Sequence, residues 1–311
     1  MVRASDPVLS LEDLDRWSFS GTALAVLGHP IQHSLSPAMH NAALAALTRQ
    51  NPAFASWRYH KFAVAPDDLP RALDLFHLHG FSGLNLTVPH KVLAFSRVQP
   101  AGAVVPLIGA VNTLRRKNAP GAWEGHNTDG YGLAAAVRAE LGRTLAGMPV
   151  ILLGAGGAAR AAAVECLQPD RRCASLWIAN RTRARLDALL AALRPLAGAG
   201  FVHAFDPSEP PPELPPGALV INATAAGLRA DDPPPVDLDR LPQPAGVYDM
   251  IYNPPESRLL RVAAAAGLPH ANGLSMLVYQ GAKSLEIWSG VPAERTAPTM
   301  LRAARAALGP A

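Results

Sequence analysis

The sequence predicts an α/β protein of two domains. Its length of 311 residues is typical of about two domains. Short apolar segments alternate with helical segments along the chain, and a glycine-rich turn interrupts an apolar run in its middle, VILLGAGGAAR at residues 150–160. Because strands that alternate with helices favour parallel pairing, we expect open parallel sheets with helices on their faces.

The first half of the chain alternates strand and helix signals. Ser36 before Pro37 has the residue types of a helix N-cap followed by proline at the first helical position. Phe81 to Thr87 is an apolar segment, and Pro89 opens a short helix after it. The predicted strands are 23–27, 57–64, 81–87, 111–114 and 123–125, and the other predicted helices are 38–48, 67–79 and 130–141.

The second half repeats this alternation after the glycine-rich turn. Two proline-rich segments, 206–217 and 231–244, are predicted loops. Residues 1–20 are acidic and lack an apolar core, so we interpret them as a short extension and not as a secretory signal. The predicted strands are 150–153, 176–179, 201–205, 219–222 and 247–251, and the predicted helices are 158–167, 183–193, 256–266, 275–288 and 294–308.

Composition and charge narrow the classes of partner. The net charge of +4 and the pI near 9.3 are too mild and too scattered for nucleic-acid binding, although they favour anionic ligands. No stretch approaches the ~18 apolar residues of a membrane span. The two cysteines, Cys166 and Cys173, form no disulfide framework, which favours a reduced, cytoplasmic setting.

Histidines alone do not predict a metal site here. His29, His33 and His40 lie close in sequence, as do His77 and His79. No acidic or cysteine partner stands at ligand spacing beside them, so we expect no metal.

The glycine-rich turn has the pattern of a dinucleotide-binding fingerprint. A strand signal precedes Gly154, Gly156 and Gly157, and a helix signal follows them. Glycines allow the backbone to turn tightly and to lie against a diphosphate at the positive helix N-terminus. Ala159 stands where the third small residue of the fingerprint belongs. A plain loop is the alternative, because glycine-rich turns also occur without a ligand.

The residues after the second strand of this half favour NADP over NAD. Sites for an unphosphorylated ribose usually place Asp or Glu about 20 residues past the turn. This chain has Asn180-Arg181-Thr182 there, with Arg183 and Arg185 beyond. Guanidinium groups pair with a 2′-phosphate in forked geometry. The alternative is a solvated, basic start of a helix.

Lysine is scarce, and one lysine follows a predicted strand in the first half. Lys91 ends the segment Asn85 to Lys91, at the strand end where open α/β sheets place ligands. A lysine ammonium there can donate or accept a proton. Asp129 in a predicted loop is a carboxylate that can pair with it. Each alone is also typical of a surface charge or a cap.

Seven segments together resemble the shikimate dehydrogenase family. They occur in the family's order and span the chain from about Ala23 to its C-terminus: 33–37, 85–91, 110–113, 127–130, 154–160, 180–182 and 276–280. The resemblance implies reversible NADPH-dependent reduction of 3-dehydroshikimate to shikimate, a step in aromatic amino acid (chorismate) biosynthesis.

The resemblance also implies a role for each matching residue. Lys91 would be the proton donor or acceptor while hydride passes from NADPH to the ring ketone, and Asp129 would be its partner. Ser34 and Ser36, helped by Tyr252, would bind the substrate carboxylate. The residues that would hold the ring hydroxyls are Asn85, Thr87, Asn112, Asp129 and Gln280. The cofactor-binding residues would be Gly154, Ala155, Gly156, Gly157 and Ala158 for the diphosphate, Asn180, Arg181, Thr182 and Arg185 for the 2′-phosphate, and Asn222, Thr224, Ile251 and Gly273 on the nicotinamide side.

The expected architecture has a discontinuous first domain. Residues 1–128 and 273–311 would form an α/β substrate domain, and residues 129–272 a Rossmann-like, doubly wound NADP domain, with a cleft between them. We expect a monomer or a homodimer. Two alternatives stay open: an NAD-dependent quinate/shikimate dehydrogenase, and a non-catalytic sensor of shikimate-pathway ligands.

Overall fold

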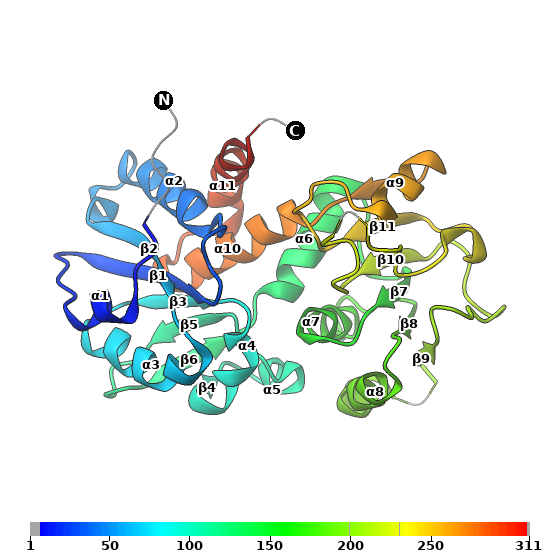
Figure 1. Cartoon of the computed structure of the whole chain (residues 1–311), viewed down its shortest axis with the longest axis horizontal. Coiled ribbons are helices and arrows are strands. Elements are labelled where there is room, and N and C mark those ends of the chain that lie inside the picture. Colours follow the sequence, from blue (N-terminus) through cyan, green and yellow to red (C-terminus); the bar gives the residue numbers. More distant parts are fainter. Residues whose placement is uncertain (1–6, 199, 230, 310–311) are drawn as a thin grey trace. The chain divides into compact units, whose positions relative to one another are not determined.

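The computed structural model describes residues 7–198, 200–229 and 231–309, which divide into two compact units (Figure 1). Unit 1 contains the described residues up to Thr128 and from Gln280 onward, and unit 2 contains those from Asp129 to Tyr279. The chain therefore leaves unit 1 and later returns to it. The return lies inside helix α10 (Leu274–Ser289), and the predicted return point, Gly273, directly precedes that helix.

Unit 1 contains a six-stranded mixed sheet with the order β2-β1-β3-β5-β6-β4. Strand β1 is parallel to β2 and β3, but β5 is antiparallel to both β3 and β6. The expectation of a parallel sheet is wrong at this point, because the short connection between β5 and β6 can join only antiparallel strands. The strands are β1 (Thr22–Gly28), β2 (Trp57–Ala63), β3 (Gly83–Leu86), β4 (Gln99–Pro100), β5 (Thr113–Arg116) and β6 (Trp123–His126).

The two faces of this sheet differ in polarity. Phe62, Leu84 and Leu86 lie in a hydrophobic core with the apolar face of α3 (Leu69–Leu78). Successive side chains of a strand point to opposite faces, so the register places Tyr59 and Asn85 on the other face. Helices α2 (Ser36–Thr48), α10 and α11 (Ala293–Leu308) lie over that second face (Figure 1).

The N-terminal extension is part of the unit 1 core. Leu9 N–H donates to Lys61 O at 2.9 Å and Leu9 O accepts from Ala63 N–H at 2.8 Å, which adds a short bridge at the edge of β2. A capping box of Ser10 and Asp13 starts helix α1 (Leu11–Asp15), and Leu14 is fully buried. The extension, which the sequence left without structure, therefore covers a sheet edge; its residues 1–6 lie outside the described part.

Two local predictions differ from the structure. Ser36 is the first residue of α2 and makes no cap; Leu35 precedes the helix, and Ser34 Oγ accepts a hydrogen bond from Ser36 N–H at 3.3 Å. Short elements were missed because they show no periodic pattern, as in α5 (Val104–Ile108), β4 and β12 (His270–Ala271).

Unit 2 contains a six-stranded parallel sheet with the order β12-β11-β10-β7-β8-β9. The chain runs outward from β7 on one side and returns to run outward from β10 on the other, which is a doubly wound topology with its switch point between β7 and β10. The predicted fold class is confirmed. The other strands and helices are β7 (Pro149–Leu153), β8 (Ser175–Ala179), β9 (Val202–Phe205), β10 (Leu219–Asn222), β11 (Gly246–Asp249), α6 (Asp129–Leu141), α7 (Gly157–Cys166), α8 (Arg183–Ala197) and α9 (Arg258–Ala265).

Candidate active site

Asn85 is the centre of a buried polar network in unit 1. Its Oδ1 accepts a hydrogen bond from Tyr59 Oη at 2.7 Å. Its Nδ2 faces Asn112 O at 3.1 Å, Thr113 Oγ1 at 3.1 Å and Ser284 Oγ at 2.9 Å. A donor on one side and acceptors on the other fix the orientation of this amide.

Asn112 connects this network to Gln280. Asn112 Oδ1 accepts from the backbone N–H of Thr128 at 2.9 Å, and its Nδ2 donates to Gln280 Oε1 at 3.3 Å. Ser284, one helical turn after Gln280, donates from Oγ to Gln280 O at 2.9 Å. The return of the chain through α10 therefore brings two polar residues to Asn85 and Asn112.

Lys91 lies beside the same network. It belongs to α4 (His90–Leu93), which begins shortly after β3 ends, and its side chain is partly exposed. The backbone of Val111 donates to Lys91 O at 2.9 Å, which ties Lys91 to the residue before Asn112. His90 Nε2 lies 2.8 Å from Val64 O, and this contact ties α4 to the segment that follows β2. Thr87 lies just before α4, and its carbonyl accepts a hydrogen bond from the N–H of His90, the first residue of that helix, at 2.8 Å.

The predicted carboxylate-binding serines form a turn, residues 31–36, that we call the serine turn. Ser34 N–H donates to Ile31 O at 3.1 Å, and Ser36 is buried. Burial raises the pKa of Tyr59 well above its usual value, while a hydrogen bond with Ser36 acts in the opposite direction. Tyr59 therefore stays protonated and links the serine turn to Asn85.

The glycine turn of unit 2 has the geometry of an open anion site. Gly154 has φ +117°, and a Cβ there would lie 3.0 Å from Ala223 O, so the close approach of the two strand ends requires glycine. A Cβ on Gly156 or Gly157 would meet no atom within 4 Å. Helix α7 begins at Gly157 without a side-chain cap, so no N-cap side chain satisfies its first N–H groups. Ala159 is fully buried, as the fingerprint requires, and Ala155 and Ala158 flank the turn partly exposed.

A second network holds the loops next to this turn. Thr224 N–H and Oγ1 both donate to Asn222 Oδ1, at 3.0 and 2.7 Å, and Asn222 Nδ2 donates to Asp249 Oδ1 at 2.9 Å. Burial raises the pKa of Asp249, against hydrogen bonds from Ser257, Ile251 N–H and Asn222. Ile251 O in turn accepts from Gly273 N–H at 3.0 Å, so four predicted cofactor-binding residues share one connected structure.

The predicted phosphate-binding residues follow β8. Asn180 Nδ2 donates to Thr182 O at 2.8 Å, which shapes the loop before α8. Arg181 and Arg185 are exposed, whereas Arg183 pairs with Asp187 at 2.9 Å. The structure therefore offers two accessible guanidinium groups for an anion at the carboxyl end of β8.

The structure assigns the remaining predicted residues to unit 2. Asp129 is the first residue of α6 and is 5% exposed. Tyr252 follows β11, and burial raises its pKa. Each unit thus collects its own set of predicted residues, and Lys91 and Asp129 belong to different units.

Sequence reasoning missed four residues of the unit 1 network. Thr113, Thr128 and Ser284 touch Asn85 or Asn112, and Tyr59 orients Asn85. Ser284 could have been found from the sequence, because it follows Gln280 by four positions and residues at this spacing share one face of a helix. Tyr59 and the threonines could be found only from the pairing of strands distant in sequence.

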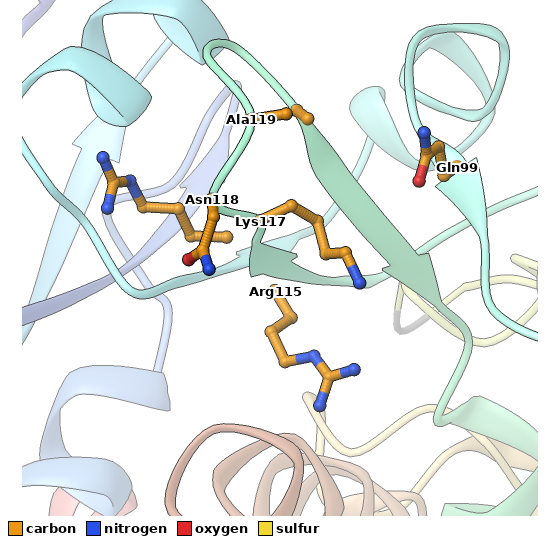
Figure 2. A pocket seen from close by; sticks show the side chains of 7 residues that line it. Gln99, Arg115, Lys117, Asn118 and Ala119 are labelled. Atoms are coloured by element: carbon orange, nitrogen blue, oxygen red, sulfur yellow. The ribbon is translucent and has the colours of Figure 1, made fainter.

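A basic pocket lies elsewhere in unit 1, around the β5–β6 hairpin (Figure 2). Its volume is about 360 Å³, and none of its lining residues is a predicted site residue: Gln99, Arg115, Arg116, Lys117, Asn118, Ala119 and Ala122. Glu124 forms ion pairs with Arg115 and, at 4.0 Å, with Lys117. Burial raises the pKa of Glu124, but hydrogen bonds from Arg115 and His126 outweigh this effect and bring the pKa below its usual value. This carboxylate therefore stays charged and offsets part of the positive charge of the pocket.

Two other kinds of feature are absent from the described residues. No helix there is both long and apolar enough to cross a membrane. No group of three or more His, Cys, Asp or Glu side chains in the same ranges could hold a metal ion.

Family models and the curated relatives of this chain agree on one family. A model of the shikimate dehydrogenase substrate binding domain matches residues 26–114, and a model of the shikimate 5′-dehydrogenase C-terminal domain matches residues 273–305. The shikimate dehydrogenase (NADP(+)) of Methanocella arvoryzae is 40% identical over 287 residues, which cover 92% of this chain and 99% of that protein.

Solved structures agree with this assignment. The shikimate 5-dehydrogenase of Thermus thermophilus, solved in complex with NADP(H) and shikimate, aligns with a TM-score of 0.77 at 33% identity over 92% of this chain and 99% of that one. A 5-ketofructose reductase of Gluconobacter aligns with a TM-score of 0.76 at 31% identity, again over 92% and 99%. The same fold therefore occurs in enzymes that are named for two different substrates.

Proposed function

The chain belongs to the shikimate dehydrogenase family, and we propose that it catalyses the reversible NADPH-dependent reduction of 3-dehydroshikimate to shikimate in aromatic amino acid biosynthesis. The observation that carries this proposal is the unit 1 network, in which Asn85, Asn112 and Gln280 are held together next to Lys91. A fixed set of amides, with a lysine in the adjoining segment, suits a polyhydroxylated ring whose ketone must gain a proton.

In the proposed mechanism, Lys91 transfers the proton. Its ammonium donates to the ketone oxygen during reduction and its amine accepts the same proton during oxidation. Positive charge next to the developing alkoxide also stabilises the transition state. We propose Asp129 as the partner of Lys91. The serine turn, with Tyr252, binds the carboxylate, and Asn85, Thr87, Asn112, Asp129 and Gln280 bind the ring hydroxyls.

NADP fits the residues of unit 2, and when bound it supplies the hydride donor or acceptor. The space beside Gly156 and Gly157 and the uncapped start of α7 suit a diphosphate. Exposed Arg181 and Arg185, with Asn180 and Thr182, suit the 2′-phosphate. We propose residues 129–272 as the NADP domain and residues 1–128 with 273–311 as the substrate domain.

A cytoplasmic location is part of the proposal. Its support is that both cysteines, Cys166 and Cys173, are buried free thiols, as is typical of reducing compartments.

The test of this proposal is a Lys91→Met variant. We expect its kcat with shikimate and NADP to fall about 100-fold or more, because general acid–base catalysis contributes about 10²–10⁴-fold. The Kd for shikimate, measured by calorimetry without cofactor, should stay within about tenfold of wild type. Lys117→Met, which alters an exposed lysine of the same unit, is the matched control and should keep the wild-type kcat.

Unchanged turnover in Lys91→Met would contradict the role of Lys91. Binding of shikimate by the wild type without any turnover would instead favour the sensor alternative.

A further inference from the structure

Lys61 is a buried cation that the proposed mechanism does not use. It lies on β2 and is 4% exposed. Within the part of the chain that the structure describes, its Nζ donates one hydrogen bond, to the backbone carbonyl of Gln32 at 3.0 Å. Among the ion pairs of the described ranges, none involves Lys61, whereas the partly exposed Lys283 pairs with Glu286 at 2.6 Å.

This arrangement leaves the ammonium incompletely satisfied. A lysine ammonium has three N–H donors, and among the described residues a single carbonyl occupies one of them. Burial of a charge without an opposite charge nearby is strongly unfavourable. Buried charges in proteins are usually paired, so an anion that binds next to Lys61 would satisfy this ammonium.

The position of Lys61 shows where this anion would bind. Tyr59 and Lys61 are two positions apart on β2, so both side chains lie on the sheet face that also carries Asn85. Tyr59 contacts Ser36 of the serine turn and donates to Asn85. Lys61 contacts the same turn through the carbonyl of Gln32.

Two features of the serine turn therefore converge with this charge. Ser34 and Ser36 stand at the start of α2, a helix of 13 residues whose N-terminus has no side-chain cap. The positive end of a helix and neutral hydroxyls are suited to an anion. The buried ammonium of Lys61, which contacts this turn, adds a full positive charge that the serine hydroxyls do not have.

We propose that Lys61 supplies the positive charge for the carboxylate of the substrate at the serine turn and makes the site specific for carboxylate-bearing substrates. This inference rests on the proposed function. It also predicts a difference in substrate charge between this protein and the 5-ketofructose reductase of the same fold, because 5-ketofructose carries no charge.

The experiment measures Kd for two ligands, shikimate and its methyl ester, in wild type and in Lys61→Gln. Glutamine keeps a donor for the carbonyl of Gln32 but removes the charge. We expect the Kd of shikimate to rise about 10- to 100-fold, since a hydrogen bond to a charged group contributes about 1.5–3 kcal/mol. The Kd of the uncharged ester should change less than about threefold.

Two results would overturn the proposal. Equal weakening of both ligands would show that Lys61 only supports the turn, and an unchanged Kd for shikimate would show that its charge is not used. Lys117→Met is the control for loss of a lysine charge and should leave both Kd values unchanged.

A second variant guards against misfolding. Lys61→Met removes both charge and hydrogen bond, and its thermal unfolding without ligand is compared with that of wild type. If Lys61→Gln fails to fold, the ratio of the two Kd values in Lys61→Met carries the test. Turnover of shikimate by wild type checks the proposed function separately, so failure of one idea is distinguishable from failure of the other.

Discussion

Tyr59 shows how one side chain settles the chemistry of another. An amide side chain can present either its oxygen or its nitrogen to a ligand. Because the protonated hydroxyl of Tyr59 donates to Asn85 Oδ1, the Nδ2 group is directed to Asn112, Thr113 and Ser284. Loss of this donor would free the amide to rotate.

His40 adds a pH-dependent contribution to stability. It is fully buried and stacks on Tyr59 with ring centroids 4.0 Å apart, and both of its ring nitrogens lack a hydrogen-bond partner in the part of the chain that the structure describes. Burial lowers the pKa of His40 to about 3, whereas an unfolded histidine titrates near 6.5. Between these values the unfolded chain binds more protons than the folded protein does.

The lowered pKa of His40 therefore predicts that the free energy of unfolding decreases in acid. Its contribution is fully present above about pH 6.5 and is lost as the pH falls toward 3, with a slope of about 1.4 kcal/mol per pH unit. In His40→Leu the free energy of unfolding, measured by urea denaturation, should fall less between about pH 7 and 5 than in wild type. His33→Gln alters an exposed histidine and should keep the wild-type slope; a wild-type slope in His40→Leu would contradict the assignment.

At the scale of elements, α1 contributes a buried side chain to the core of unit 1. Leu14 is fully buried in the core that contains Phe62 and Phe76. We expect Leu14→Ala to lower the free energy of unfolding by about 2–5 kcal/mol, because a core cavity replaces the side chain.

The matched control for α1 is Leu78→Ala. Leu78 is 76% exposed at the end of α3, so its loss should change the free energy of unfolding by less than about 0.5 kcal/mol. Equal effects of the two substitutions would mean that the N-terminal segment does not belong to the core.

Periodic elements could be predicted from the sequence, and pairing could not. The apolar run before Gly154 and the spacing of residues 130–141 identify β7 and α6 with small errors at their ends. The antiparallel β5 and the bridge at Leu9 depend on contacts between distant segments, which a single sequence does not contain. Ser36 has the composition of a cap, but the serine turn places it inside the helix.

The candidate site divides in the same way. Motifs predicted Asn85, Lys91 and the glycine turn as site residues, because their residue types suit the expected chemistry. Lys61 stood among the scarce lysines of the sequence without a role. Only its burial and its contact with Gln32 make it a candidate, and both depend on the folded sheet.

For the whole molecule, we propose that each unit provides one half of the chemistry. Unit 2 has the switch point between β7 and β10, with the Gly154 turn after one strand and Asn222 at the end of the other, where doubly wound sheets bind ligands. Unit 1 holds the amides and Lys91. A hydride transfer needs both sets, so neither unit alone should support turnover.

The most direct test is the steady-state reduction of the nicotinamide cofactor by wild-type protein, with shikimate or quinate as substrate and NADP or NAD as cofactor. We expect kcat/KM to be highest for shikimate with NADP, and about 10- to 100-fold lower with NAD, because Arg181 and Arg185 would then have no 2′-phosphate to bind. Preference for quinate with NAD, or no reduction of either cofactor by shikimate, would contradict this account.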